Sequence, residues 1–467
     1  MSLPAREIRD LPAPPGNYLR LVGPGIIAGG VALSSGEFIL WPLITSQVGL
    51  GLLWGALVGV VTQFFINMEV ERYTLATGET ALTGFNRFGR HWGLVFAFFV
   101  CFGNLWPGWV LSSATLSTFL FGGNPTTIAV ILLVVIGAAL TLAPIIYIAL
   151  ERLMFVKVAA VSILIVLGLT FAVEDTTWRE LPAAFLGFGR IPAGLDIALV
   201  FGAIAYAGSG GGTNLCQSNW IRDKGFGMGQ YVPRLVSPLT GQEEASRTVT
   251  SYMFEPTAPN MSRWRSWWLF ANTEQLFSFV LVTATTIGLT SMLAHSTLFG
   301  VPGLTNDVSL LSVEAQALEV SVGRWFAVLF LAIGALSLFG SAMGTIDYTC
   351  RLTADILKST YLTRAGMSES QLYFWLVWGI VALGCVIMLS GARQPITFLV
   401  ISACTAGTMM FVYSMLLIAL NRTKLPAAIR IKPFRIGVLV WATILYGSLA
   451  AITIYTQLPT LFHQSMS

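Results

Sequence analysis

The sequence predicts an all-α polytopic membrane protein made of two five-helix repeats and one additional C-terminal helix. Three observations support this fold class: the apolar composition, the number of long apolar segments, and the interruption of two of them. Of the 467 residues, 55% are hydrophobic and only 10% are charged, and the mean hydropathy is +0.75. A soluble domain carries roughly 25% charged residues. The composition therefore indicates a lipid bilayer as the surroundings of the chain and excludes a nucleic-acid-binding role.

Eleven apolar segments are each long enough to cross a bilayer as a helix, which takes about 20 residues. They fall at 21–48, 52–75, 93–121, 126–148, 150–173, 194–221, 266–294, 322–348, 370–392, 394–420 and 434–457. The fourth and fifth are nearly continuous, so the boundary between them is the least defined.

Basic residues sort to alternate sides of these segments. If the N-terminus is cytoplasmic, 22 of the 26 Lys and Arg residues fall on the cytoplasmic side, Lys157 and Arg351 among them. The other four are Arg179, Arg190, Arg324 and Arg393. An excess of Lys and Arg marks cytoplasmic loops. We therefore expect a multi-pass protein of the plasma (bacterial inner) membrane, with a cytoplasmic N-terminus and an external C-terminus.

Small polar residues interrupt the first and sixth segments at their middles. The first interruption reads Leu33-Ser34-Ser35-Gly36-Glu37, and the second runs from Ala207 to Asn214 through Gly208-Ser209-Gly210-Gly211-Gly212. Unwound backbone at membrane depth is tolerated only where protein buries it or where it lines a cavity. Paired interruptions in two repeats are a pointer to the substrate site of a secondary transporter.

The interruptions also define the domain organisation. We expect a cytoplasmic tail (1–20), a first repeat (21–173), a second repeat (194–420) with a cytoplasmic loop (222–265), and an eleventh helix (434–457). Because five is odd, the second repeat has inverted topology, as in LeuT-like transporters. The alternative is that the glycines only allow close helix packing. Consecutive glycines, however, each lower helix propensity by about 1 kcal/mol relative to Ala.

The first two segments resemble the Nramp family of divalent metal transporters. Gly23-Pro24-Gly25 matches the family's GPG opening, and Leu33 to Phe38 stand where the family carries leucine, DPGN and phenylalanine. Gly51-Leu52-Leu53-Trp54 and the stretch 72–79 continue the match. Asn214-Leu215 aligns with the end of the family's MPHNL segment, and Gly344-Thr345 is similar to its TGT element. The resemblance fails in the loop 222–265.

The resemblance implies a metal site with altered ligands. The family binds its metal through the aspartate and asparagine of DPGN and the sixth-helix methionine, and here these positions are Ser34, Glu37 and Gly211. The family's histidines become Thr213 and Ser218, and its carbonyl ligand falls at Gly208. Loss of methionine removes the soft ligand that selects transition metals. Hard ions such as Mg²⁺ prefer oxygen ligands and one or two carboxylates.

The candidate substrate-binding residues lie in or beside the two interruptions. They are Ser34, Ser35, Gly36, Glu37, Gly208, Ser209, Gly211, Thr213 and Asn214, with Glu37, Ser34 and Gly208 as metal ligands. Asn67, Asn104 and Thr405 are polar residues on flanking helices and form a second tier. Glu37 is the one carboxylate in either interruption, and an acid at membrane depth indicates function. Its structural alternative is a partner for an arginine or for free backbone amides.

Two functions remain open at this point. The first is secondary-active transport of a divalent cation, with Mg²⁺ or Mn²⁺ favoured over Fe²⁺ and with a proton as an optional coupling ion. The second is proton- or sodium-coupled transport of a small organic solute such as an amino acid, which amides of the glycine run would hold. No phosphate-binding loop or Ser-His-Asp set is visible, so we expect neither an enzyme nor a cofactor other than the transported cation.

Overall fold

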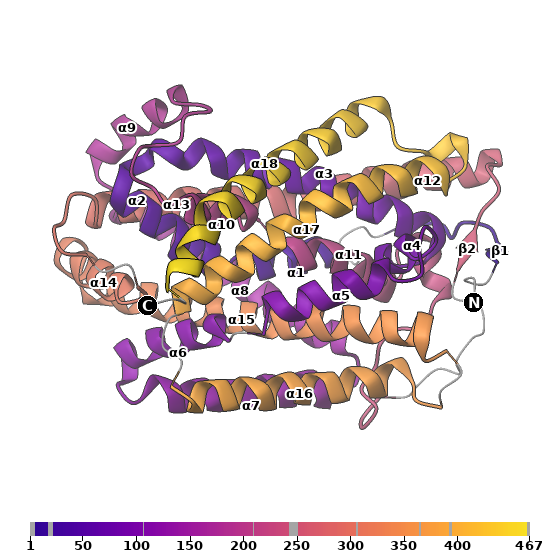
Figure 1. The fold of residues 1–467 in the computed structure, drawn as a ribbon, viewed down its shortest axis with the longest axis horizontal. Helices are drawn as coiled ribbons and strands as arrows, with labels where there is room; N and C mark the ends of the chain where they lie inside the picture. Colours follow the sequence, from indigo (N-terminus) through magenta and orange to yellow (C-terminus); the bar gives the residue numbers. More distant parts are fainter. Residues whose placement is uncertain are drawn as a thin grey trace.

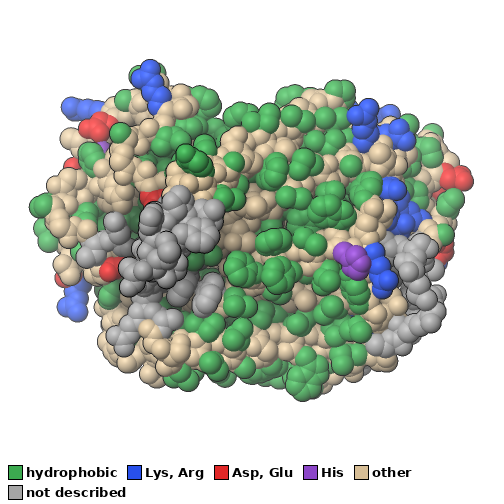
Figure 2. All heavy atoms as spheres, in the orientation of Figure 1, with side chains coloured by type: hydrophobic (Ala, Val, Ile, Leu, Met, Phe, Trp, Pro, Cys, Tyr) green, Lys and Arg blue, Asp and Glu red, His purple; other side chains and the backbone are tan. Residues whose placement is uncertain are grey.

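Long apolar helices lie side by side along one direction of the molecule (Figure 1). This computed structural model describes residues 5–16, 22–105, 107–208, 210–241, 251–304, 307–363, 366–391 and 395–464. Within these ranges, nine helices are long and apolar enough to cross a membrane. Hydrophobic side chains cover the middle of the surface in Figure 2, and charged side chains gather towards its two ends. The chain is a multi-pass membrane protein.

The helices follow the apolar segments of the sequence. Those before residue 190 are α1 (Pro24–Ala32), η2 (Gly36–Leu40), α2 (Trp41–Val48), η3 (Gly49–Leu52), α3 (Leu53–Thr77), α4 (Ala81–Phe85), α5 (Trp92–Gly103), α6 (Gly108–Phe121), α7 (Pro125–Leu142), α8 (Ile146–Phe171) and α9 (Asp175–Leu186). Those after it are α10 (Ile197–Ala205), α11 (Gly211–Lys224), η4 (Gly227–Tyr231), α12 (Ala258–Gln275), η5 (Leu276–Leu281), α13 (Val282–Thr297), α14 (Leu310–Ser321), α15 (Arg324–Ile356), η6 (Leu357–Tyr361), α16 (Glu369–Leu389), α17 (Pro395–Thr423), η7 (Ala427–Ile429) and α18 (Pro433–Gln464).

Two local features explain why the described residues form nine long apolar helices although eleven spans are expected. The first two expected spans form one run from Pro24 to Thr77, because the 3-10 turn η3 joins α2 to α3. The sixth expected span is divided between α10 and α11, which are short helices of nine and fourteen residues. The total of eleven spans therefore stays a prediction.

The half-helix α1 lies at the centre of the molecule. All nine of its residues are buried. It packs against α8, α15 and α11, and α15 in turn packs against α6, α8 and α16. Among the polar residues that follow α1, Ser35 and Glu37 are buried, whereas Ser34 is partly exposed.

Two basic residues that the charge pattern places in cytoplasmic segments are in fact inside the protein. Lys157 lies in α8, about three turns from its start at Ile146, and its side chain has no exposed surface. Arg351 of α15 is equally buried and is paired with Asp347 at 2.8 Å and with Asp223. Lys157 lies within the expected span 150–173, near its start, whereas Arg351 lies in the part of α15 that extends beyond the expected span 322–348.

The N-terminal tail crosses the end of the molecule opposite the C-terminal end of α18 (Figure 1). Its strand β1 (Glu7–Ile8) pairs in parallel with β2 (Tyr252–Met253) of the expected loop 222–265. Beside it, Glu79 accepts hydrogen bonds from Arg87. Burial by itself raises the pKa of Glu79, but the hydrogen bond and charge of Arg87 outweigh it and leave this pKa below its ordinary value. The tail is thus held by strand pairing next to a charged cluster.

Candidate functional site

The first break in the helices follows α1. Leu33 and Ser34 form a turn, and the chain then continues with the wider pitch of η2. The backbone amide of Ser34 donates a hydrogen bond to Oε2 of Glu37 at 3.0 Å. Gly36 and Glu37, expected within the break, are helical residues of η2. π-helical turns inside α-helices are frequent at functional sites.

The second break separates α10 from α11 and covers residues 206–210. Gly208 and Gly210 have φ angles of 117° and 62°, which side chains other than that of glycine rarely allow. The break is shorter than the expected one, because Gly211 to Asn214 already form the first turn of α11. Ser209, one of the candidate residues, lies outside the described residues.

Gln63 of α3 satisfies the backbone groups that this second break exposes. Its Nε2 donates to the carbonyl oxygens of Ala205 at 2.9 Å and Ala207 at 3.0 Å. Its Oε1 accepts from the backbone amide of Gly210 at 2.8 Å. One buried amide side chain therefore bridges the two half-helices. The sequence reasoning missed this residue, although a glutamine in the middle of an apolar segment is a signal that could have identified it.

The two breaks lie against each other. A Cβ atom on Gly36 would come within 2.8 Å of the carbonyl oxygen of Tyr206, so this glycine is what allows the approach. The carboxylate of Glu37 also lies within electrostatic reach of the backbone amide of Gly208. The structure thus brings together Glu37 and Gly208, two of the three candidate metal ligands, with Ser34 held beside Glu37 by its amide.

Glu37 is fully buried, and its Oε1 has no hydrogen-bond partner among the described residues. Lys157 of α8 interacts electrostatically with it. An ionised carboxylate buried in this way is costly unless charge or hydrogen bonds compensate it. The free oxygen at the junction of two broken helices is therefore suited to a cationic ligand or a proton.

Asn214 takes part in a separate network with α3 and α17. Its Nδ2 donates to Oδ1 of Asn67 at 2.6 Å, and its Oδ1 accepts from the hydroxyl of Tyr413 at 3.0 Å. Both asparagines are buried. This arrangement favours a structural role for Asn214 and Asn67, because these contacts hold α11 against α3 and α17.

Asn104 and Thr213 belong to a third polar group on the other side of α11. Oδ1 of Asn104 accepts from the hydroxyl of Tyr348 at 3.1 Å, and the same hydroxyl interacts with Thr213. Ser402 links this group to Tyr206 in the second break, with 2.6 Å between the two hydroxyl oxygens. Asn104 therefore connects to the second break indirectly, through Ser402. Ser35 is buried in the first break.

Gly211 occupies the position that the resemblance assigns to a metal-binding methionine, and it has no room for a side chain. A Cβ atom there would lie 2.6 Å from Cβ of Ala406 in α17. The φ angle of 39° adds backbone strain for any other residue. The soft ligand is thus absent, and close packing of α11 on α17 takes its place.

Two further buried acids, Glu274 and Asp347, have structural partners. Glu274 of α12 accepts from the backbone amide of Gly25 at 2.8 Å, and from that of Gly23 at 3.2 Å, at the start of α1. Such capping satisfies the amides that a helix N-terminus leaves without a partner. Asp347 pairs with Arg351 within α15. Neither acid points to a second cation site.

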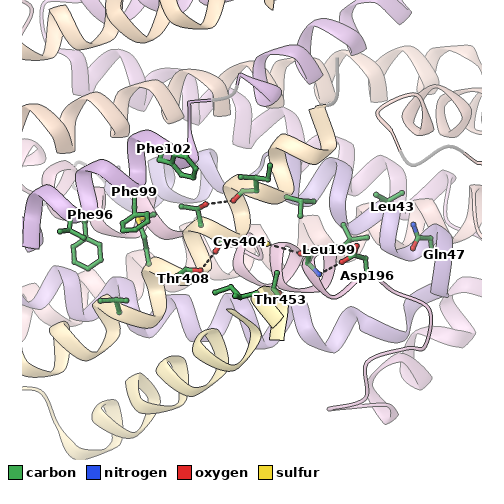
Figure 3. Close-up of a pocket in the computed structure, with 18 of the residues that line it drawn as sticks. Leu43, Gln47, Phe96, Phe99, Phe102, Asp196, Leu199, Cys404, Thr408 and Thr453 are labelled. Carbon is green, nitrogen blue, oxygen red and sulfur yellow. Dashed lines mark hydrogen bonds between the residues drawn. The ribbon is translucent and has the colours of Figure 1, made fainter. Parts of the chain in front are cut away.

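A cavity of about 1080 Å³ lies elsewhere in the molecule, and Figure 3 shows residues that line it. It runs between α2, α5, α10, α17 and α18, and its walls are mainly apolar, with Asp196 as their one charged residue among those described. Thr405 lines it, but none of the described residues of the two breaks does. Thr405 therefore lines this cavity, whereas Glu37 and Gly208 do not.

Comparison with known proteins shows the fold of this chain. No family model and no curated protein matches the sequence. Two solved variants of the manganese transporter of Eremococcus coleocola align with TM-scores of 0.69 and 0.70 at 12% identity, covering 98% of this chain and 91% of theirs. The same transporter in complex with an aromatic bis-isothiourea substituted compound aligns with a TM-score of 0.65 at 11% identity. The predicted LeuT-like fold class is thereby confirmed.

Proposed function

We propose that this chain is a secondary-active transporter of a divalent cation, with Mg²⁺ or Mn²⁺ favoured. The observation that supports it best is Glu37, a buried carboxylate with one free oxygen at the junction of the two broken helices. Its location matches the general position of substrate sites in transporters with discontinuous helices. The proposal further agrees with the fold shared with manganese transporter structures.

The chemistry of the site favours a hard cation. Glu37 supplies one carboxylate, and hydroxyl and carbonyl groups near Ser34 and Gly208 supply neutral oxygen ligands. Mg²⁺ is usually held by one or two carboxylates and keeps several of its waters. The positive charge of Lys157 weakens the hold of Glu37 on a cation. This suits transport, which requires binding that is favourable enough for entry but weak enough for release.

The experiment is to measure Mn²⁺ and Mg²⁺ uptake in proteoliposomes and binding by isothermal titration, for the wild type and Glu37→Gln. Loss of the charged ligand is expected to weaken binding by about tenfold or more. Glu314→Gln is the matched control, because Glu314 is another buried acid with free oxygens but lies in α14, outside both breaks. Wild-type affinity in Glu37→Gln, or no saturable divalent uptake by the wild type, would contradict the proposal.

A small organic solute is the second candidate cargo. It is favoured by one observation: among the described residues, no three metal-ligating side chains of the His, Cys, Asp and Glu type gather in one place. Thermal unfolding with amino acids or small acids distinguishes the two candidates. Saturating cargo stabilises the protein by roughly 3–4 kcal/mol at about 100 to 1,000 times its dissociation constant. Stabilisation by such solutes and not by divalent ions would favour the second candidate.

A further inference from the structure

Lys157 reaches the end of α1 from the neighbouring helix α8. Its Nζ donates a hydrogen bond to the hydroxyl oxygen of Ser341 in α15 at 2.5 Å. The side chain has no exposed surface. A lysine at membrane depth is costly and normally indicates a functional role.

The hydroxyl group that accepts from Lys157 is itself surrounded by oxygen atoms. The hydroxyl oxygen of Ser341 lies 3.1 Å from the carbonyl oxygens of both Val31 and Leu33. A second hydroxyl, that of Ser337, donates to the carbonyl of Leu33 at 2.6 Å. α1 ends at Ala32, so these carbonyls lie at a helix C-terminus, where the last carbonyls lack helical partners and carry partial negative charge.

The fold leaves room for this lysine. A Cβ atom on Gly340 would come within 3.0 Å of Cδ of Lys157, so the aliphatic stem passes over the glycine to reach Ser341. The charged group that acts on Lys157 is Glu37, and the hydrogen bond of its ammonium group goes to a neutral hydroxyl. A lysine serving only as the counter-ion of Glu37 would need neither the hydrogen bond to Ser341 nor the passage of its side chain over Gly340.

We propose that the hydroxyl of Ser341 and the carbonyl groups at the end of α1 form a monovalent-cation site, which the ammonium group of Lys157 occupies as a built-in cation. In secondary transporters, half-helix C-terminal ends and unwound carbonyls are the groups that coordinate Na⁺. Here a covalently attached ammonium group takes that position. The protein therefore works without Na⁺, whichever cargo it carries, and this inference does not depend on the divalent-cation proposal.

The experiment measures thermal unfolding of the purified full-length protein in sodium, ammonium or N-methylglucamine chloride at equal ionic strength. Lys157→Ala removes the built-in cation and opens its site, so ammonium or Na⁺ should raise the unfolding temperature by a few degrees in a saturable manner. Lys157→Met fills the same space without charge, and no such rise is expected. Lys432→Ala, at an exposed lysine, is the control for loss of a positive charge.

The wild type gives an independent arm, which holds even if Lys157→Ala does not fold. We expect its unfolding temperature to be the same in sodium and N-methylglucamine chloride, and radiolabelled Na⁺ not to bind saturably. Saturable Na⁺ binding by the wild type would overturn the proposal. So would a folded Lys157→Ala variant that gains no stability from either cation, or an equal gain in Lys157→Met, which would leave Lys157 as a counter-ion of Glu37 alone.

Discussion

Glu314 of α14 is a buried acid without a hydrogen-bond partner on either oxygen among the described residues. Helices α15, α13 and α6 pack against α14. Burial raises the pKa of Glu314 from its ordinary value of 4.5 to about 8. Between these two values the folded protein holds a proton that the unfolded chain releases. Stability is therefore expected to fall as the pH rises from about 4.5 to about 8.

This prediction can be measured with Glu314→Gln, which cannot titrate. Thermal unfolding across the range from about pH 5 to pH 9 should show the wild type losing stability relative to the variant up to about pH 8, and no further relative change above it. Parallel curves for the two proteins would show that Glu314 does not hold a proton in the folded state.

At the same scale, the sequence predicted the residues of the breaks better than their partners. Glu37 was identifiable because burying an acid in an apolar segment costs free energy, which indicates a functional role. Lys157 gave a similar signal but lies close to the expected start of its segment, so the charge count assigned it to the cytoplasmic side. Gln63 was missed because its role depends on the carbonyl groups of Ala205 and Ala207, which are more than a hundred residues away along the chain.

At the scale of helices, the packing of α11 on α17 fixes what residue 211 can be. We predict that Gly211→Met, which restores the methionine of the Nramp pattern, lowers stability by about 2 to 5 kcal/mol. The reasons are the positive φ of Gly211 and the overlap of a new Cβ atom with Ala406. Thermal unfolding is the measurement. Gly437→Met in α18, where a Cβ atom meets nothing within 4 Å, is the control and should not lower stability.

The contrary outcome would also be informative. Cd²⁺ is a probe of thioether ligation. A stable Gly211→Met variant that gains Cd²⁺ binding would mean that α17 moves away from residue 211. It would also mean that the site can still place a methionine as a metal ligand, as in the Nramp pattern. The structure argues against this, because the tight contact involves both Cα and Cβ of Ala406 and not the end of a flexible side chain.

For the broken helices, the sequence pattern predicts where a break lies but not the residue at which it ends. The glycine run located the break between α10 and α11 correctly, but the expected end at Asn214 was too late. Glycine lowers helix propensity without forbidding a helix. At Gly211 and Gly212, packing against α17, α5 and α15 stabilises the helical conformation despite this low propensity. Tertiary contacts of this kind cannot be read from a local pattern.

For the whole molecule, the orientation in the membrane stays a prediction that charge and shape both support. The segments expected to be cytoplasmic hold 22 of the 26 Lys and Arg residues, and they still hold 20 when the buried Lys157 and Arg351 are left out. β1 and the C-terminal end of α18 lie towards opposite ends of the helix bundle (Figure 1). We therefore predict that a membrane-impermeant maleimide labels Thr127→Cys, at the exposed start of α7, on intact cells.

The same reagent should label Ala13→Cys, in the exposed part of the N-terminal tail, only after the cells are opened. The wild type, with five cysteines in or beside apolar helices, measures the background. Labelling of Ala13→Cys on intact cells would reverse the orientation. It would also place the Glu79–Arg87 cluster and the paired strands β1 and β2 outside the cell, against the excess of basic residues that this face carries.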